Sequence, residues 1–310
     1  MRDGRFSMCS IVSEAFAVLQ PNAYGAFRRF GPTKLGAELN RDACATLFNE
    51  NEPLINVEEW LLRADYAAEK SKDLKARKRL QLIKELLVSL LPDVSDIRIP
   101  ASGTEVPTPE AKTPDGWVPV LALSTGYRAT MAWLTDFMAR MLDRYPDSPN
   151  PCAEPAVVLI DQLDTHLHPK WQRQLIADLS KTFPATQFIV TAHSPLMVQA
   201  MPQANIVLLR RDGDHVSICN RPDDVRGWRI DQIVASDLFE EQPTRDVETD
   251  EKLEERRNLI SKKTLTKAET TRLKFLNDWA DGLPTADTPE DIRAMDLIRR
   301  AAGKMQKSKS

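Results

Sequence analysis

The sequence predicts an α/β fold built on a layered parallel sheet, with helical segments before and after it. The apolar run AVVLI at 156–160 predicts a strand buried on both faces, as strands of parallel sheets usually are. A helical pattern at 169–183 follows, and then a second buried strand, TQFIVTA, at 186–192. Such strand–helix–strand alternation places the functional edge of the sheet at the carboxyl ends of its strands.

Apolar residues at helical spacing predict further helices between Val57 and Leu91, where Pro92 ends the pattern, and from about Gly126 to Leu142. Short strand-like runs are expected at four places: 11–19, 96–100, 117–123 and 205–220, with a Pro/Thr-rich loop over 101–116 and a hairpin turn at Asp212-Gly213.

The composition divides the chain into three predicted segments. Residues 1–120 are expected to form a partial N-terminal lobe with a helical insertion, and 121–226 the α/β core. Residues 227–310 are strongly charged and are predicted to form a helical hairpin and a last helix near 289–302.

The charge and cysteine content exclude some classes of protein. A net charge of −3 over 310 residues gives no whole-protein attraction to DNA or to an anionic membrane, although a local basic patch stays open. The four cysteines have no short spacing, which indicates reduced thiols rather than a disulfide framework. No apolar run approaches the roughly 18 residues of a membrane span, and no signal peptide is evident. We therefore expect a cytoplasmic protein.

Three short motifs fall at the predicted functional edge. Leu123-Ser124-Thr125-Gly126 opens a helix, whose N-terminus offers unpaired N–H groups and a positive dipole end to a phosphate. Asp161 ends the first buried strand, where its carboxylate can hold Mg²⁺ directly or through water. His193 ends the second strand. The plainer alternatives are a simple helix cap, an aspartate that caps the next turn, and a structural histidine.

In this order, the motifs resemble those of the ABC ATPase superfamily, in its soluble branch of SMC-like, RecF-like and OLD-like ATPases. The resemblance covers roughly residues 20–300 and is most specific in LIDQLDTHLHPKWQRQLIADLSKTFPATQFIVTAHSP. It implies a P-loop NTPase-like (ABC-type) fold that uses ATP and Mg²⁺. Many stand-alone bacterial ATPases of this branch belong to anti-phage or toxin–antitoxin systems.

The resemblance also implies a role for each motif. Asp161 matches the Walker B aspartate that holds Mg²⁺, and His193 matches the switch histidine that contacts the γ-phosphate. Asp164 matches the D-loop aspartate, which couples two sites across a dimer. The signature residues contact the nucleotide of the opposite subunit, and they are Ser124, Thr125 and Gly126.

Two features depart from the family pattern. None of the 11 glycines begins the G-x-x-x-x-G-K-[ST] loop that cradles phosphates, so the chain resembles the C-terminal portion of the family. Gln162 stands where the family has a catalytic glutamate, and glutamine cannot accept the proton of the attacking water. General-base catalysis contributes about 10²–10⁴-fold, or roughly 3–5 kcal/mol. We expect impaired hydrolysis by this chain alone.

Two other residue pairs have plainer explanations. His166 and His168 lack a third ligand, so a structural role is favoured over zinc. Arg28 and Arg29 could reach a phosphate or a partner, but a solvated loop or an ion pair is the favoured interpretation.

Three functions remain open from the sequence. The first is an ATPase lobe that completes composite sites in a homodimer or with a P-loop-bearing polypeptide, with a nuclease or toxin as effector. The second is a non-catalytic scaffold derived from such an ATPase. The third is a nucleic-acid-binding protein, for which the net charge gives no support.

Overall fold

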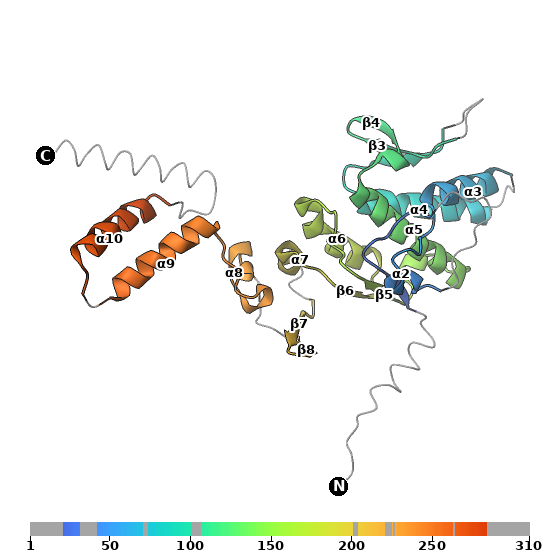
Figure 1. Cartoon of the computed structure of the whole chain (residues 1–310). Coiled ribbons are helices and arrows are strands. Elements are labelled where there is room, and N and C mark those ends of the chain that lie inside the picture. The colour runs from blue at the N-terminus through green and yellow to red at the C-terminus, as the bar shows by residue number, and fades with distance from the viewer. Residues whose placement is uncertain are drawn as a thin grey trace, which may run out of the picture. The chain divides into compact units, whose positions relative to one another are not determined.

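The computed structural model describes most of the chain, and Figure 1 shows the order of its elements. The described residues are 21–31, 42–70, 74–100, 107–200, 204–220, 225, 227–262 and 264–283. They belong to two compact units, Met1–Ile233 and Val234–Ser310, which we describe separately. The strand predicted at 11–19 and the helix predicted near 289–302 lie outside the described residues.

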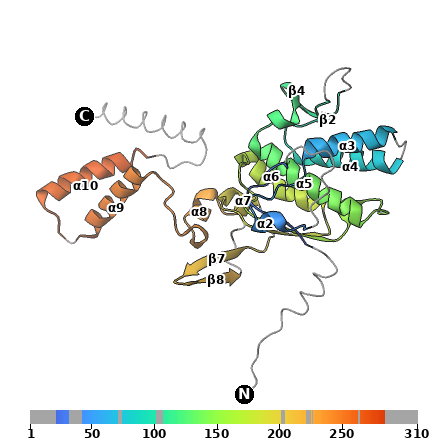
Figure 2. The same ribbon diagram turned by 45° about the vertical axis from the view of Figure 1, so that its right-hand side comes forward.

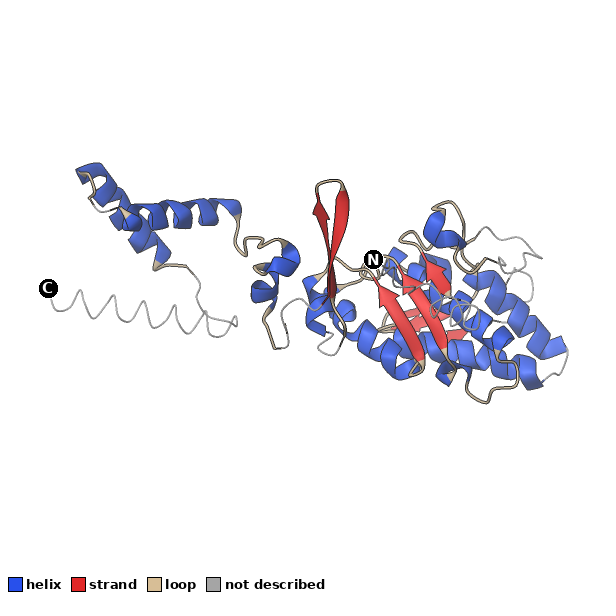
Figure 3. Ribbon diagram, turned by 90° about the horizontal axis from the view of Figure 1, so that it is seen from below, coloured by secondary structure: helices blue, strands red, loops and turns tan. Residues whose placement is uncertain are grey.

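The first unit contains the predicted parallel sheet. Its strands are β1 (Asn22–Tyr24), β5 (Ala156–Ile160) and β6 (Thr186–Val190), in the order β1-β5-β6. Both neighbouring pairs are parallel, and Figure 3 shows the strands side by side. Helix α6 (Pro169–Thr182) connects β5 to β6. The predicted α/β fold is thereby confirmed.

The prediction that these strands are buried on both faces was wrong. Val158 and Ile160 of β5 are fully buried, whereas Val157 and Leu159 between them are only half-buried. On β6, Ile189 is 47% exposed. Alternate residues of a strand point to opposite faces, so the described part of the chain covers one face of the sheet and leaves the other partly open. The apolar run alone could not reveal this.

The covered face packs against a mostly buried helix, α5 (Thr125–Arg144). Its Trp133 ring lies 5.8 Å from the ring of Tyr24 on β1, and Phe137 lies 5.1 Å from Phe183 after α6. These four aromatic side chains are at most 1% exposed. Burial of this much aromatic surface makes α5 the centre of the hydrophobic core.

The predicted helical insertion forms a helical pair, α3 (Val57–Lys70) and α4 (Leu74–Leu90), which Figure 2 shows side by side. The end of α4 is tied to the rest of the unit by two side chains. Tyr127 Oη donates to Pro92 O at 2.7 Å, and Trp171 Nε1 donates to Leu90 O at 3.1 Å.

A small antiparallel sheet follows α4. Its strands are β2 (Asp96–Arg98), β3 (Glu110–Thr113) and β4 (Gly116–Pro119), in that order. The prediction of a loop throughout 101–116 was wrong at β3. The polar sequence EAKT has low strand propensity, but pairing on both sides and burial of Ala111 stabilise the strand. The predicted strand at 117–123 ends early, in a short 3₁₀ helix (Val120–Ala122).

Short elements complete the described part of the first unit: α2 (Ala45–Phe48), a 3₁₀ helix (Pro151–Ala153), α7 (Pro195–Ala200), β7 (Val207–Asp212) and β8 (His215–Asn220). The β7–β8 hairpin was predicted, but Asp212 pairs with His215, so its turn consists of Gly213 and Asp214. Gly213 has φ 61°, which suits glycine in such tight turns. Helix α8 (Ile230–Val234) spans the boundary between the units.

The second unit contains the predicted helical hairpin. A 3₁₀ helix (Asp237–Phe239) precedes α9 (Val247–Ser261) and α10 (Lys267–Ala280), which contact each other. Thr266 and Glu269 form a reciprocal capping box at the start of α10. Among the described residues of both units, no helix is long and apolar enough to cross a membrane.

The aromatic core makes a stability prediction. We expect Phe137→Ala to lower the free energy of unfolding by about 3–5 kcal/mol, because it leaves a cavity beside Phe183. Phe48→Ala is the matched control, since Phe48 is 84% exposed, and it should change stability by less than about 0.5 kcal/mol. Urea unfolding measures both. Equal effects would contradict the placement of Phe137 in the core.

Candidate nucleotide site

The predicted Mg²⁺ ligand, Asp161, is fixed at the carboxyl end of β5. Its N–H donates to Tyr24 O of β1 at 2.8 Å. From the β6 side, Thr191 Oγ1 donates to Asp161 Oδ1 at 2.6 Å and accepts from Gln162 N at 2.7 Å. One hydroxyl therefore orients both the carboxylate and the following peptide. Thr191 was not among the predicted site residues, although it belongs to the quoted strand end.

Arg28 supports this loop; of the two favoured interpretations, a solvated loop or an ion pair, the solvated loop was wrong for Arg28. Only 5% of Arg28 is exposed, whereas Arg29 is exposed. Its Nη1 donates to Asp161 O at 2.6 Å, and its Nη2 donates to Gln162 O at 2.8 Å. Burial lowers the pKa of Arg28 to about 10, although Asp161 and Asp164 act in the opposite direction. The Arg28 side chain therefore holds the backbone of Asp161 and Gln162 in position.

Gln162 adopts an uncommon backbone conformation for a non-glycine residue, with φ 49°. Its carbonyl accepts from Arg28, as above, and from Thr165 N at 3.1 Å. Its side-chain Oε1 accepts from Thr165 Oγ1 at 3.3 Å. The tight turn after β5 is therefore held by hydrogen bonds at both the backbone and the side chain of Gln162.

Asp164 and His193 meet although they are far apart in the sequence. Asp164 Oδ2 accepts from His193 N at 3.1 Å, while its Oδ1 is buried without a hydrogen-bond partner in the described part of the chain. The His193 side chain is exposed. Next to it, Ser194 Oγ donates to Gln172 Oε1 of α6 at 2.6 Å. The structure thus brings Asp161, Asp164 and His193 to one edge of the sheet, as predicted.

The signature segment lies beside the same loop. Ser124 is the N-cap residue of α5 and Thr125 its first residue; both are exposed, and Ser124 makes no capping bond through its side chain. Gly126 is buried against the backbone of His166, where an added Cβ would lie 2.3 Å from His166 O. Close packing therefore requires glycine at 126 and leaves the α5 N-terminus open to a ligand.

Of the two histidines His166 and His168, the second has a structural role. His168 caps α6, since its Nδ1 accepts from Lys170 N at 3.3 Å. His166 is exposed and has φ 63°. Among the described residues, no cluster of three His, Cys, Asp or Glu side chains could hold a metal ion. A magnesium ion needs fewer than three protein ligands, because it commonly binds one or two carboxylates together with phosphates and water. Asp161 fits that role.

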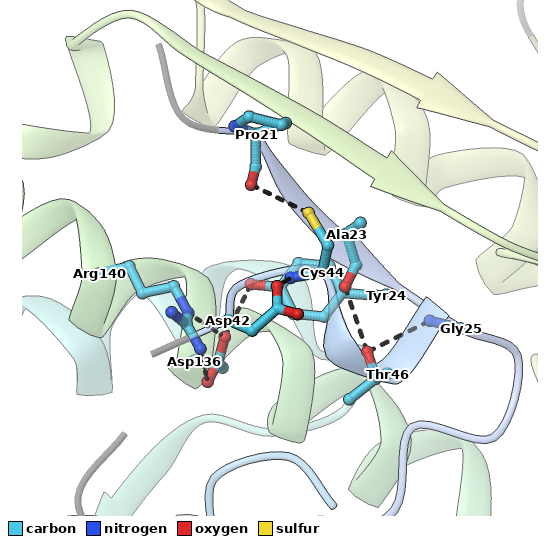
Figure 4. A network of polar contacts seen from close by, with 9 residues as sticks. All are labelled: Pro21, Ala23, Tyr24, Gly25, Asp42, Cys44, Thr46, Asp136 and Arg140. Carbon is cyan, nitrogen blue, oxygen red and sulfur yellow. Dashed lines mark hydrogen bonds and ion pairs between the residues drawn. The ribbon is translucent and has the colours of Figure 1, made fainter. Parts of the chain in front are cut away.

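A second polar network anchors β1, and Figure 4 shows it. Tyr24 Oη donates to Asp136 Oδ2 at 3.0 Å, and Arg140 Nε donates to the same oxygen at 2.7 Å. Burial and then Asp136 raise the pKa of Tyr24 well above its usual value. This network holds β1 against α5, and β1 in turn holds Asp161. It depends on residues 112 apart in sequence, so no local pattern could reveal it.

The two adjacent arginines allow a sharp test of the loop. We expect Arg28→Met to lower the free energy of unfolding by about 2–4 kcal/mol, because two carbonyl groups lose charged donors. Arg29→Met is the control and should have an effect below about 0.5 kcal/mol, since Arg29 is exposed. Urea unfolding measures both variants. If the two substitutions had equal effects, the assignment to Arg28 would be wrong.

Comparison with known proteins gives a family match. A family model described as "AAA domain, putative AbiEii toxin, Type IV TA system" matches residues 46–198. The Retron Ec83 probable ATPase of Escherichia coli is 34% identical over 185 residues, covering 59% of this chain and 32% of that protein. The Septu protein PtuA of Bacillus mycoides (strain KBAB4) is 30% identical over 194 residues, covering 62% of this chain and 25% of that protein. The chain spans a third or less of these relatives.

Among solved structures, an SMC ATPase from work on ATP-driven dimerisation has a TM-score of 0.35 at 18% identity, covering 46% of this chain and 82% of that chain. This score is too low to add to the sequence match. The match of residues 46–198 coincides with the stretch that places Asp161, Asp164 and His193 at one sheet edge. Residues 46–198 therefore resemble this AAA family, whose model they match.

Proposed function

We propose that this chain is the ATP-binding lobe of an ABC-type ATPase and shares a composite nucleotide site with a P-loop supplied from outside residues 1–310. One observation carries the proposal. Asp161 and His193 follow the carboxyl ends of neighbouring parallel strands, where Thr191 donates to Asp161 and Asp164 accepts from His193 N, although the sequence contains no P-loop pattern. A relative named as a probable ATPase supports ATP as the nucleotide that this site would bind.

The proposed roles follow from the positions of the side chains. Asp161 would hold Mg²⁺ through the carboxylate that Thr191 orients, and the ion would neutralise charge on the phosphates. His193 would donate a hydrogen bond to the terminal phosphate, since its ring is exposed while its backbone N–H is held by Asp164. The α5 N-terminus, with Ser124, would face the phosphates of a nucleotide held by a second subunit.

Gln162 limits the chemistry that we propose. It stands at the position of the general base, and its amide can orient a water molecule but cannot accept its proton. We therefore propose tight closure around ATP with slow hydrolysis. Such a lobe is suited to hold a nuclease or toxin effector in one state until ATP is consumed. Relatives named as retron and Septu proteins support the proposed role in anti-phage defence. We propose that the chain acts in the cytoplasm.

The first test is nucleotide binding by calorimetry. Alone, the chain should bind Mg-ATP more weakly than about 1 mM, and addition of a P-loop-bearing polypeptide should bring Kd into the micromolar range. Asp161→Ala and His193→Ala should each weaken the restored binding by about 10-fold or more, which is about 1.4 kcal/mol. His166→Ala is the matched control for the second variant.

Two results would overturn this proposal. Micromolar binding by the chain alone, lost in both variants, would mean that a phosphate site exists without a P-loop. No gain in binding on adding the P-loop-bearing polypeptide would instead favour the scaffold function.

The second test restores the missing base. In the assembly that binds ATP, Gln162→Glu should raise kcat by about 10²-fold or more and leave KM nearly unchanged, because only proton transfer is altered. Gln81→Glu makes the same chemical change on the exposed surface of α4 and should have no effect. Phosphate release measures both. An unchanged kcat for Gln162→Glu would remove Gln162 from the proposed mechanism.

A further inference from the structure

Thr191, directly after β6, is exposed, yet both its backbone groups and its hydroxyl bond to the end of β5 and the turn that follows it. Its N–H donates to Ile160 O at 3.0 Å, and its carbonyl accepts from Leu163 N at 3.0 Å. Its hydroxyl donates to Asp161 Oδ1 at 2.6 Å and accepts from Gln162 N at 2.7 Å. Exposed hydroxyls commonly bond to water, so two protein partners on this hydroxyl indicate a role for the side chain in this turn.

The direction of the two side-chain bonds is fixed by the chemistry of the groups. A backbone N–H can only donate, so the Thr191 oxygen must accept from Gln162 N. The single hydroxyl proton is then available to Asp161, whose ionised carboxylate can only accept. The separation of 2.6 Å is typical of a hydroxyl bonded to a charged oxygen. The bond between Thr191 and Asp161 is therefore charge-assisted.

The two carboxylate oxygens of Asp161 differ as a result. The Thr191 proton lies against Oδ1, whereas no donor in the described part of the chain contacts Oδ2. The backbone of Asp161 is also held, because its N–H donates to Tyr24 O and its carbonyl accepts from Arg28. With the backbone held, the carboxylate can offer both oxygens equally to a cation only by giving up its bond to Thr191.

The number of oxygens that a carboxylate offers affects which divalent cation it binds. Ca²⁺ takes about six to eight oxygen ligands and often binds a carboxylate through both oxygens. Mg²⁺ is smaller, requires octahedral geometry and keeps several waters beside its one or two carboxylates. An aspartate with one unoccupied oxygen therefore suits Mg²⁺ better than Ca²⁺.

We propose that Thr191 determines the ion specificity of the nucleotide site, because its hydroxyl makes Asp161 a one-oxygen ligand and so favours Mg²⁺ over Ca²⁺. This inference rests on the function proposed above and assigns the choice of ion to one side chain. Thr191 acts through Asp161 and is therefore a positioning residue.

Three substitutions separate the hydroxyl from the shape of the side chain. Thr191→Val keeps the branched shape but removes both side-chain bonds, whereas Thr191→Ser keeps the hydroxyl. Thr186→Val is the matched control, because it makes the same chemical change on β6. The Thr186 hydroxyl oxygen is buried and has no hydrogen-bond partner among the residues that the structure describes.

Amide hydrogen exchange in the chain alone tests the bonds of the hydroxyl. In Thr191→Val, the Gln162 amide should exchange about 10-fold faster, because it loses its acceptor. The Leu163 amide donates to the backbone carbonyl of Thr191 and should keep its rate. Thr191→Ser and Thr186→Val should leave both rates unchanged. An unchanged rate at Gln162, or equal acceleration at Gln162 and Leu163, would overturn the proposed role of the hydroxyl.

ATP binding in the presence of each ion tests the specificity. In the assembly with the P-loop-bearing polypeptide, calorimetry gives the Kd of ATP in excess Mg²⁺ and in excess Ca²⁺, with EDTA as the metal-free reference. Thr191→Val should lower the ratio of the Ca²⁺ value to the Mg²⁺ value by about 5-fold or more, the effect of one lost hydrogen bond. Thr191→Ser and Thr186→Val should keep the wild-type ratio. General damage to the site would weaken binding equally in both ions, and an unchanged ratio in Thr191→Val would overturn the proposal.

Failure of this inference and failure of the proposed function give different results. If the wild-type assembly does not bind ATP, or binds it equally in Mg²⁺ and in EDTA, the proposed metal site at Asp161 is wrong and the ion specificity is wrong with it. If Mg²⁺ promotes binding but the ratio does not respond to Thr191→Val, the proposed function stands and only the role of Thr191 is refuted.

Discussion

The buried guanidinium of Arg28 is the interaction on which the candidate site depends. It donates to the carbonyl groups of Asp161 and Gln162 and so joins the loop after β1 to the loop after β5. A charged group with 5% exposure is retained only where its donors are satisfied, because desolvation is costly. Gln162 can adopt its positive φ because its carbonyl is held on that side. The carboxylate of Asp161 is then oriented by the Thr191 hydroxyl.

The loop after β5 is connected to two other parts of the first unit, the segment after β6 and the hydrophobic core. Toward β6, the Thr191 hydroxyl and the Asp164 carboxylate connect the loop to the segment that carries His193. Toward the core, β1 is held to α5 by the Tyr24–Asp136 hydrogen bond and by aromatic packing against Trp133. The site is therefore built on the covered face and the carboxyl edge of the sheet. Within the described residues, the opposite face of the sheet is only partly covered.

Several elements followed from local pattern. The helical spacing between Val57 and Leu91 predicted α3 and α4, and the apolar runs predicted β5 and β6 because side-chain periodicity is a local property. Strand β3 was missed since EAKT owes its conformation to pairing with two neighbours. The one-sided burial of β5 among the described residues was missed because an apolar strand can have the same sequence whether one face or both faces of its sheet are covered.

By itself, the sequence predicted the fold class and the resemblance to an ATPase family, and it placed Asp161 and His193 at strand ends, since strand ends and helix starts have local signatures. Only the tertiary structure decided which of the two arginines is buried, because Arg28 and Arg29 have identical chemistry and adjacent positions. It also decided that Thr191 orients Asp161 across 30 residues. Such contacts depend on which strands lie side by side, and that arrangement is set by packing of the whole unit rather than by any short segment.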